Sequence, residues 1–143
     1  MEKERVVVND TNVFIDYLGQ REQFYFPAAK IISLADRGLI RLIVSSLSFA
    51  TGSYVLETHC HKTAEEIVES YRQFVTICGI ATVDEATILT TIKHPFDDFE
   101  DAMQYHAALA DNADCIVTRN KSDFTLTSIP VMEPQEFLDM LVE

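Results

Sequence analysis

The most constraining feature of the sequence is the stretch from Val6 to Asp16, which reads VVVNDTNVFID. Its β-branched run at residues 6–8 predicts a strand that is buried on both faces, as in a parallel sheet. The run stops at Asn9 and Asp10, residue types that favour turns and helix N-caps. In open α/β sheets, ligands bind just beyond the C-terminal ends of the strands. The stretch therefore predicts a strand that delivers the Asp10 carboxylate to such an edge.

The rest of the chain alternates between strand-like and helix-like segments. Further strands are expected at residues 39–45, 80–83, 115–118 and 129–132. Helices are expected at residues 13–18, 24–35, 47–59, 64–75, 85–92 and 97–110, and from Pro134 onward. Strands that alternate with helices imply βαβ units with a parallel sheet covered on both faces. We therefore predict an α/β fold, a three-layer α/β/α sandwich with a parallel four- or five-stranded sheet.

Helix caps and apolar faces refine this prediction. Thr63 with Glu66 matches a capping box, and Asp97 with Glu100 suggests another capping pair. The expected apolar positions of the helix at 85–92 are Ala86, Ile88 and Leu89. Those of the helix at 97–110 are Phe99, Ala102, Met103, His106 and Leu109.

The chain of 143 residues has 48% hydrophobic content, which suits a single domain over residues 1–143. Its net charge of -12 argues against unassisted nucleic-acid binding, but is compatible with a divalent cation or a basic protein partner. The three widely spaced cysteines predict no disulfide framework. No targeting segment and no membrane span are expected, so a cytoplasmic location is the default.

Acidic side chains follow or begin several of the predicted elements. Besides Asp10, Asp98 and Asp101 lie three apart near the start of the helix at 97–110, and Asp123 follows the strand at 115–118. Carboxylates that share a pocket repel one another unless a cation is present. Oxygen ligands suit Mg²⁺ or Mn²⁺, which can activate water and stabilise charge on a phosphodiester. The alternative for each acid is a structural role in a cap or turn.

Two further interpretations concern charged residues outside this set. Asp97 and Glu100 are interpreted as first-turn acids that complement the helix dipole, and Asp16 as a cap or solvated acid. An acidic chain needs local cations to hold RNA. The candidates are Arg41, Lys93, Arg119 and Lys121.

Three motifs resemble those of PIN-domain ribonucleases, including the VapC-type toxins. Residues 10–13 (DTNV) after a hydrophobic strand resemble the family's opening, residues 98–102 (DFEDA) its third-acid motif, and residues 117–124 (VTRNKSDF) its closing motif. Their order and spacing fit along nearly the whole chain. The resemblance implies a metal-dependent endoribonuclease, the toxin component of a toxin–antitoxin pair, that hydrolyses RNA phosphodiesters with metal-activated water.

Matched onto this chain, the family's catalytic acids would be Asp10, Asp101 and Asp123, which would hold one or two Mg²⁺ or Mn²⁺ ions. The residues that would orient substrate or other ligands are Thr11, Asn12, Asp98, Thr118 and Asn120. The resemblance also implies a homodimer and an antitoxin partner. The acidic composition suggests that this antitoxin is basic, with an arginine that pairs with the acids.

The sequence departs from the family at one position. The family generally has a glutamate on the helix after the second strand, and Thr51 occupies that position here. Glu57, six residues later, would lie on another part of the helix. The alternative function is therefore a catalytically impaired PIN-fold binding module that acts through protein partners. A third hypothesis, an aspartyl-phosphate phosphatase with Asp10 as nucleophile, calls for an aspartate at position 12, where Asn12 stands.

Overall fold

A computed structural model describes residues 4–125 and 127–142. Residues 1–3, which begin the stretch where no targeting segment is expected, lie outside the described residues. Five parallel strands form one sheet in the order β3-β2-β1-β4-β5. They are β1 (Arg5–Asn9), β2 (Ile40–Ser45), β3 (Gly79–Ala81), β4 (Cys115–Val117) and β5 (Val131–Met132). The parallel sheet of the prediction is thus confirmed, with β1 at its centre.

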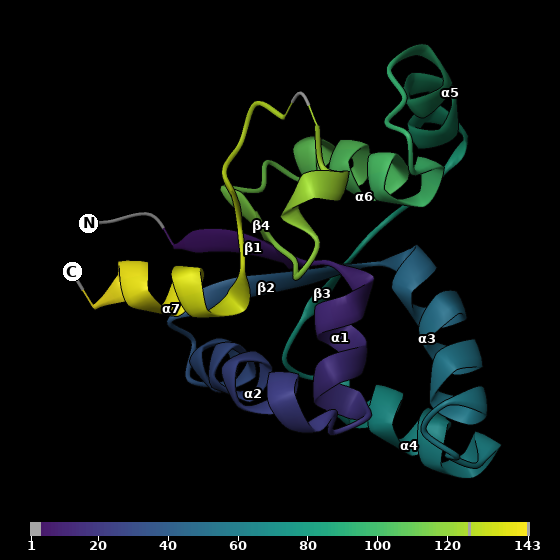
Figure 1. The fold of residues 1–143 in the computed structure, drawn as a ribbon, viewed down its shortest axis with the longest axis vertical. Helices are drawn as coiled ribbons and strands as arrows, with labels where there is room; N and C mark the ends of the chain where they lie inside the picture. Colours follow the sequence, from purple (N-terminus) through teal and green to yellow (C-terminus); the bar gives the residue numbers. More distant parts are fainter. Residues whose placement is uncertain (1–3, 126, 143) are drawn as a thin grey trace.

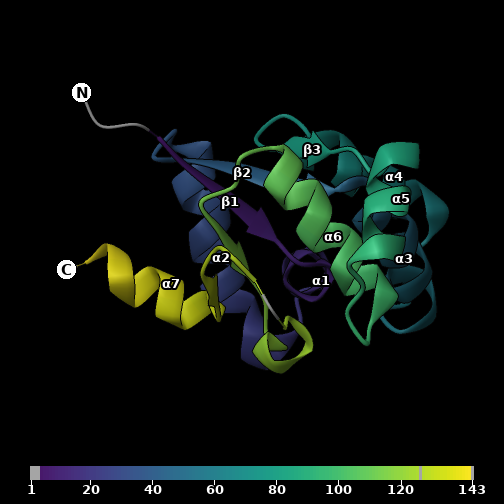
Figure 2. The ribbon, with the colours of Figure 1, turned by 90° about the horizontal axis from the view of Figure 1, so that it is seen from above.

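Helices cover both faces of the sheet, as Figures 1 and 2 show. The helices are α1 (Thr11–Leu18), α2 (Glu22–Asp36), α3 (Ser46–Thr58), α4 (Ala64–Phe74), α5 (Glu85–Lys93), α6 (Phe99–Ala110) and α7 (Pro134–Leu141), with a 3₁₀ turn, η1 (Lys121–Asp123). Helices α1 to α4 lie below the sheet in Figure 1, whereas α5 and α6 lie above it. The three-layer α/β/α arrangement is therefore confirmed. In the part of the chain that the structure describes, no helix is long and apolar enough to cross a membrane.

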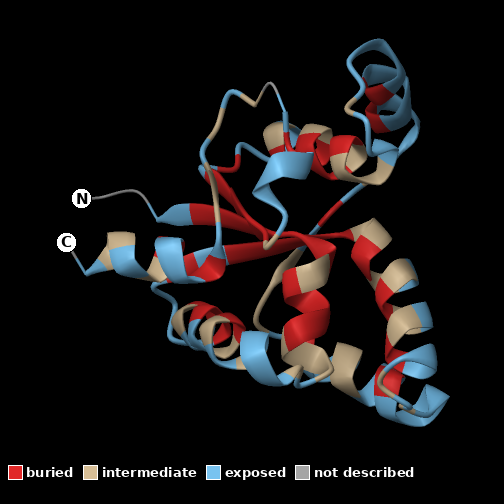
Figure 3. Cartoon of the chain, in the orientation of Figure 1, coloured by how far each residue is buried: buried red, intermediate tan, exposed pale blue. Residues whose placement is uncertain are grey.

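The central strands β1, β2 and β4 contribute alternate residues to two separate cores, because successive side chains of a strand point to opposite faces. Val7 and Val44 pack with α1, α2 and α7 on one face. Val8 and Ile43 pack with α6 on the other. Both sets are almost fully buried, which explains the continuous apolar runs in the sequence (Figure 3).

The predicted apolar face of α5 is wrong. Ile88 and Leu89 are 41% and 53% exposed, whereas Thr87 and Thr91 are buried. The reason is that α5 packs beside α6 rather than flat on the sheet (Figure 1). Thr91 satisfies its hydroxyl by donating to the Thr87 carbonyl, so a polar residue can be buried there.

The capping pair predicted for α6 is also wrong. Asp98, not Asp97, is the N-cap, and its Oδ1 accepts a hydrogen bond from the Asp101 backbone N–H at 3.0 Å. Phe99 is 41% exposed, although the sequence pattern placed it on the apolar stripe. The buried residues of α6 are Ala102, Gln104, Tyr105, Ala107 and Ala108. In contrast, the capping box of Thr63 and Glu66 at the start of α4 is confirmed.

Gly52 lies in the middle of α3, where the helix closely approaches α1. A Cβ atom at this position would lie 2.9 Å from Cε2 of Phe14 and 3.0 Å from the Tyr71 hydroxyl. The missing side chain thus lets the Phe14 ring pack against α3. Because β2 leads directly into α3, this contact also positions the residues of α3 that face the sheet edge.

Candidate active site

Asp10 occupies the point where the central strand turns into α1. Its side chain is 3% exposed, and Oδ1 accepts a hydrogen bond from the Thr11 backbone N–H at 2.8 Å. Oδ2 accepts from the Thr118 hydroxyl at 2.8 Å and from Asn12 Nδ2 at 3.0 Å. Burial raises the pKa of Asp10, and the hydrogen bonds from Thr118 and Thr11 act in the opposite direction. The carboxylate is therefore held in one orientation by the ends of two adjacent strands.

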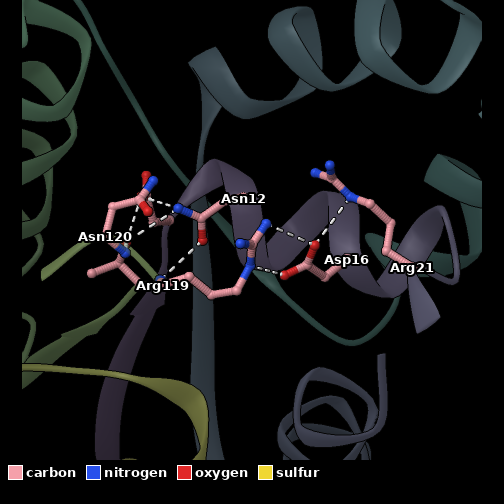
Figure 4. Close-up of polar contacts among 7 residues, drawn as sticks. Asn12, Asp16, Arg21, Arg119 and Asn120 are labelled. Atoms are coloured by element: carbon pink, nitrogen blue, oxygen red, sulfur yellow. Dashed lines mark hydrogen bonds and ion pairs between the residues drawn. The ribbon is translucent and has the colours of Figure 1, made fainter. Parts of the chain in front are cut away.

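Thr118 connects this carboxylate to the closing motif. It lies just after β4 and is fully buried, and its Oγ1 accepts hydrogen bonds from Asn12 Nδ2 at 3.2 Å and from the Asn120 backbone N–H at 3.0 Å. Asn12 Oδ1 in turn accepts from the Arg119 backbone N–H at 3.2 Å (Figure 4). Asn12 and Thr118 thus position Asp10, while Asn120 is exposed and enters the network through its backbone.

Asp101 lies among the other acids. It is half-buried in the first turn of α6, and its pKa is raised to about 8. Burial is the largest cause, followed by the negative charges of Asp10, Asp98, Asp123 and Glu100. The structure therefore brings the four acids predicted for the site into one electrostatic environment, and adds Glu100 to them.

Asp98 and Asp123 border a shared cleft at the outer side of this environment. The cleft has a volume of about 280 Å³ and lies between the start of α6 and η1. Both residues are exposed, in contrast to Asp10. Asp98 therefore both caps the N-terminus of α6 and lines the cleft.

Glu100 points toward α3 instead of capping α6. Its Oε1 accepts a hydrogen bond from the Thr51 hydroxyl at 2.8 Å, across 49 positions of the sequence. Its negative charge also contributes to the raised pKa of both Asp10 and Asp101. The interpretation of Glu100 as a first-turn residue that only complements the helix dipole is therefore wrong. Nothing in the local sequence indicates this contact, because it depends on how α6 packs beside α3.

Thr11 and Gln104 form a buried polar layer next to Asp10. The Thr11 hydroxyl lies 2.7 Å from the Ser48 hydroxyl and accepts a hydrogen bond from Gln104 Nε2 at 3.1 Å. Gln104 is 2% exposed, and its Oε1 has no hydrogen-bond partner among the described residues. The structure thus places the Thr11 hydroxyl in the contact between α1, α3 and α6. Gln104 was missed in the sequence because it falls outside the predicted apolar stripe.

Asp16 forms a buried ion pair beside the site, shown in Figure 4. It is 1% exposed, and Arg119 Nε lies 2.6 Å from Oδ2, while Arg21 Nε lies 3.0 Å from Oδ1. The Arg119 guanidinium also lies 3.8 Å from the centre of the Phe24 ring. The interpretation of Asp16 as a cap or solvated acid is therefore wrong. Similarly, Lys121 pairs with Glu136 at 3.0 Å, so two of the four candidate RNA-binding cations are already neutralised.

The donor set of the site fits a hard divalent cation. Within residues 4–125 and 127–142, no three His, Cys, Asp or Glu side chains already lie together as ion ligands. The groups that surround Asp101 are all carboxylates, however, and such oxygen donors suit Mg²⁺ or Mn²⁺. After burial, the negative charges of Asp10, Asp98, Asp123 and Glu100 contribute to the raised pKa of Asp101. A cation bound by rotated side chains would offset this charge.

Comparison with known proteins agrees with this architecture. A family model for the PIN domain matches residues 5–122. The chain is 28% identical over 141 residues to ribonuclease VapC1 of Aquifex aeolicus (strain VF5), covering 97% of this chain and 96% of that protein. Because the family model spans well over half of the sequence, the comparison extends beyond the short motifs at the site.

Solved structures show the same fold at low sequence identity. VapBC2 from Rickettsia felis, bound to a DNA fragment from its promoter, aligns with a TM-score of 0.62 and 18% identity over 90% of this chain and 97% of that chain. The sarcin-ricin loop cleaving toxin VapC20 of Mycobacterium tuberculosis aligns with a TM-score of 0.61 and 12% identity over 77% and 86%. By its family match and its fold, this chain belongs to the PIN domain family.

Proposed function

We propose that this chain is a Mg²⁺- or Mn²⁺-dependent endoribonuclease and the toxin of a toxin–antitoxin pair. The observation that carries the proposal is the position of Asp101, half-buried and within electrostatic reach of Asp10, Asp98, Asp123 and Glu100. This acidic cluster lies at the edge where β1 and β4 end, which is where open α/β sheets bind ligands. The 28% identity to ribonuclease VapC1 along nearly the whole chain supports the reaction class.

In this proposal, Asp10, Asp101 and Asp123 would hold the ion. When bound, the ion would supply an activated water and offset the charge of the phosphodiester. Thr118 and Asn12 hold the Asp10 carboxylate through their hydrogen bonds to Oδ2, so it needs little reordering to act as a ligand. A carboxylate that is already oriented binds with a smaller loss of side-chain freedom than a mobile one.

RNA would have to approach an acidic protein with a net charge of -12. The guanidinium of Arg119 and the ammonium of Lys121 are engaged with acids, whereas Arg41 and Lys93 are exposed. We therefore propose that a divalent ion at the acids is needed for RNA binding as well as for cleavage, because phosphate contacts dominate such affinity.

The proposed partner is a basic antitoxin. The structurally similar VapBC2 from Rickettsia felis is a complex bound to a DNA fragment from its promoter, which supports a partner of this kind here. An arginine of the antitoxin could pair with the acids through its forked guanidinium. We also propose a homodimer in the cytoplasm, for which the exposed apolar side chains of α5, Ile88, Leu89 and Ile92, would supply contact area. Light scattering on the purified protein would test the dimer.

Ribonuclease assays on single-stranded and structured RNA test the proposed activity. Cleavage in Mn²⁺ that stops in excess chelator, and that Asp10→Asn and Asp101→Asn abolish, would support it. Glu65→Gln removes an exposed first-turn glutamate of α4 and serves as the matched control, with activity expected to remain. Products with 3′-hydroxyl and 5′-phosphate ends would agree with hydrolysis by an activated water.

The alternative is a catalytically impaired PIN-fold binding module. Thr51 favours it, because this residue cannot itself provide a carboxylate. Absence of cleavage by wild-type protein across RNA substrates, together with a stable complex with a protein partner, would favour this alternative over the ribonuclease. Release of phosphate from small phosphomonoesters would instead revive the phosphatase hypothesis.

A further inference from the structure

We infer that Glu100 supplies, from α6, the carboxylate that the family resemblance leads us to expect on α3 at the position of Thr51, and that Thr51 positions it by a hydrogen bond. The inference rests on the proposed metal-dependent function. It goes beyond that function because it adds a ligand-supplying residue and a positioning residue. It also explains how the chain could keep a complete set of acids despite the threonine on α3.

The contact between the two residues carries the inference. The Thr51 hydroxyl donates to Glu100 Oε1 at 2.8 Å, and both residues are half-buried. Thr51 stands on α3, which follows β2, and Glu100 is the second residue of α6. The Glu100 carboxylate therefore reaches α3 at Thr51, the position at which the family resemblance leads us to expect a glutamate, but comes from α6.

Glu100 is free for this task because another residue caps the helix. Asp98 accepts the hydrogen bond from the first-turn N–H of Asp101, so capping does not require the Glu100 side chain. Glu100 directly precedes Asp101 in the first turn of α6, so its carboxylate adds a further acid at this end of the helix. Carboxylates held close together repel one another and destabilise a protein that binds no cation, whereas a bound divalent cation offsets this repulsion.

A second observation points to a ligand on the same side of α6. Gln104 lies four residues after Glu100 and therefore on the same helical face. Gln104 is 2% exposed, and its amide hydrogen-bonds Thr11 and contacts Asp10, while Oε1 has no partner among the described residues. A buried carbonyl oxygen without a donor is rare, and a water of a hydrated cation would satisfy it.

The decisive experiment is titration calorimetry with Mn²⁺ alone, without RNA, on the purified 143-residue chain. Glu100→Gln keeps the size of the side chain but removes its charge, and we expect it to weaken Mn²⁺ binding by about 10- to 100-fold. The matched control is Glu65→Gln, which removes an exposed first-turn glutamate of α4 and should leave Mn²⁺ affinity unchanged. Asp101→Asn should abolish binding.

The role of Thr51 is tested through its hydroxyl. Thr51→Val removes the hydrogen bond with little change in shape and should weaken Mn²⁺ binding, whereas Thr51→Ser should retain wild-type affinity. The double variant Thr51→Glu/Glu100→Gln moves the carboxylate back to α3 and should restore most of the affinity lost in Glu100→Gln. This rescue distinguishes a ligand role of Glu100 from a merely structural one. If Glu100 were only structural, moving the carboxylate to position 51 would not restore Mn²⁺ affinity. Thermal unfolding of each variant without metal checks that it folds.

The outcomes separate the inference from the proposed function. Wild-type affinity in Glu100→Gln, with binding lost in Asp101→Asn, would overturn the inference and leave the metal site intact. Loss of binding in Glu100→Gln without any rescue by the double variant would also overturn it. Absence of Mn²⁺ binding by the wild-type protein would instead overturn the proposed metal-dependent function itself.

Discussion

Replacement of Asp101 by asparagine is expected to stabilise the metal-free protein near pH 7. Folding raises the pKa of this carboxyl from 3.8 to about 8, chiefly by burial and then by the neighbouring acids. Between these two values the folded state keeps a proton that the unfolded chain has released. Stability of the wild-type protein therefore falls as the pH rises through this window. Asparagine has no proton to lose and avoids this penalty.

The size of the effect follows from the same shift. A pH of 7 lies about 3 units above the pKa of this carboxyl in the unfolded chain. At about 1.36 kcal/mol per unit, the loss of folding stability at pH 7 is therefore at most ~4 kcal/mol. Asp101 is only half-buried, so water screens part of this. We expect a gain of about 2 kcal/mol for Asp101→Asn, or about 6 °C in melting temperature for a chain of this size.

Urea unfolding in the presence of a chelator, at several pH values between about 4 and 8, measures this gain. Asp97→Asn is the control, because it removes one negative charge from an exposed residue beside the same helix. The gain in Asp101→Asn should be small near pH 4 and grow toward pH 8. An equal gain in stability in Asp97→Asn would refute the explanation. A gain in Asp101→Asn that does not change with pH would also refute it. Added Mn²⁺ should reverse the order of stability by binding only the wild-type site.

Three further predictions concern stability and local electrostatics. Gly52→Ala should destabilise the protein by about 1–3 kcal/mol in urea unfolding, because its Cβ would lie 2.9 Å from the Phe14 ring; unchanged stability would contradict this close packing. Asp16→Asn should lower the free energy of unfolding by about 3 kcal/mol, because two arginines would lose their buried partner; a change below about 0.5 kcal/mol would show that water replaces it. Thr63→Ala should raise the pKa of Glu66 only part of the way to its ordinary value, because the Thr63 backbone N–H, the larger cause of the lowering, remains and only the side-chain contact is lost; an NMR titration in which this pKa returned fully to its ordinary value would contradict the dominant role of the backbone hydrogen bond.

The strand positions and the edge they create follow from local sequence. The centres of β1, β2 and β4 are continuous apolar runs, at residues 6–8, 42–44 and 115–117, because strands of a covered parallel sheet are buried on both faces. Asp10 and Thr118 come directly after two of these strands, so a parallel sheet necessarily places them at the same edge. The capping box of Thr63 and Glu66 was predictable for a similar reason, since its contacts lie within one helical turn.

The exposed face of α5 could not be predicted from its sequence. Periodicity indicates which residues share a face of a helix, but not which face meets the rest of the protein when apolar residues are distributed around it. Thr87 and Thr91 are buried because α5 packs beside α6, and Ile88 remains exposed. The buried position of Asp16 depends likewise on Arg119, which is distant in the sequence and adjacent only in the folded chain.

By itself, then, the sequence determined the succession of strands and helices along the chain and the sheet edge that Asp10 occupies. It also determined the helix at whose start Asp98 and Asp101 lie. These features depend on local hydrophobic patterns and on residues within a few positions of one another. Only the tertiary structure decided that Glu100 meets Thr51 and that Gln104 lies beside Asp10. The physical reason is that these contacts join separate helices, and the angle and depth at which helices pack depend on side chains far apart in the sequence.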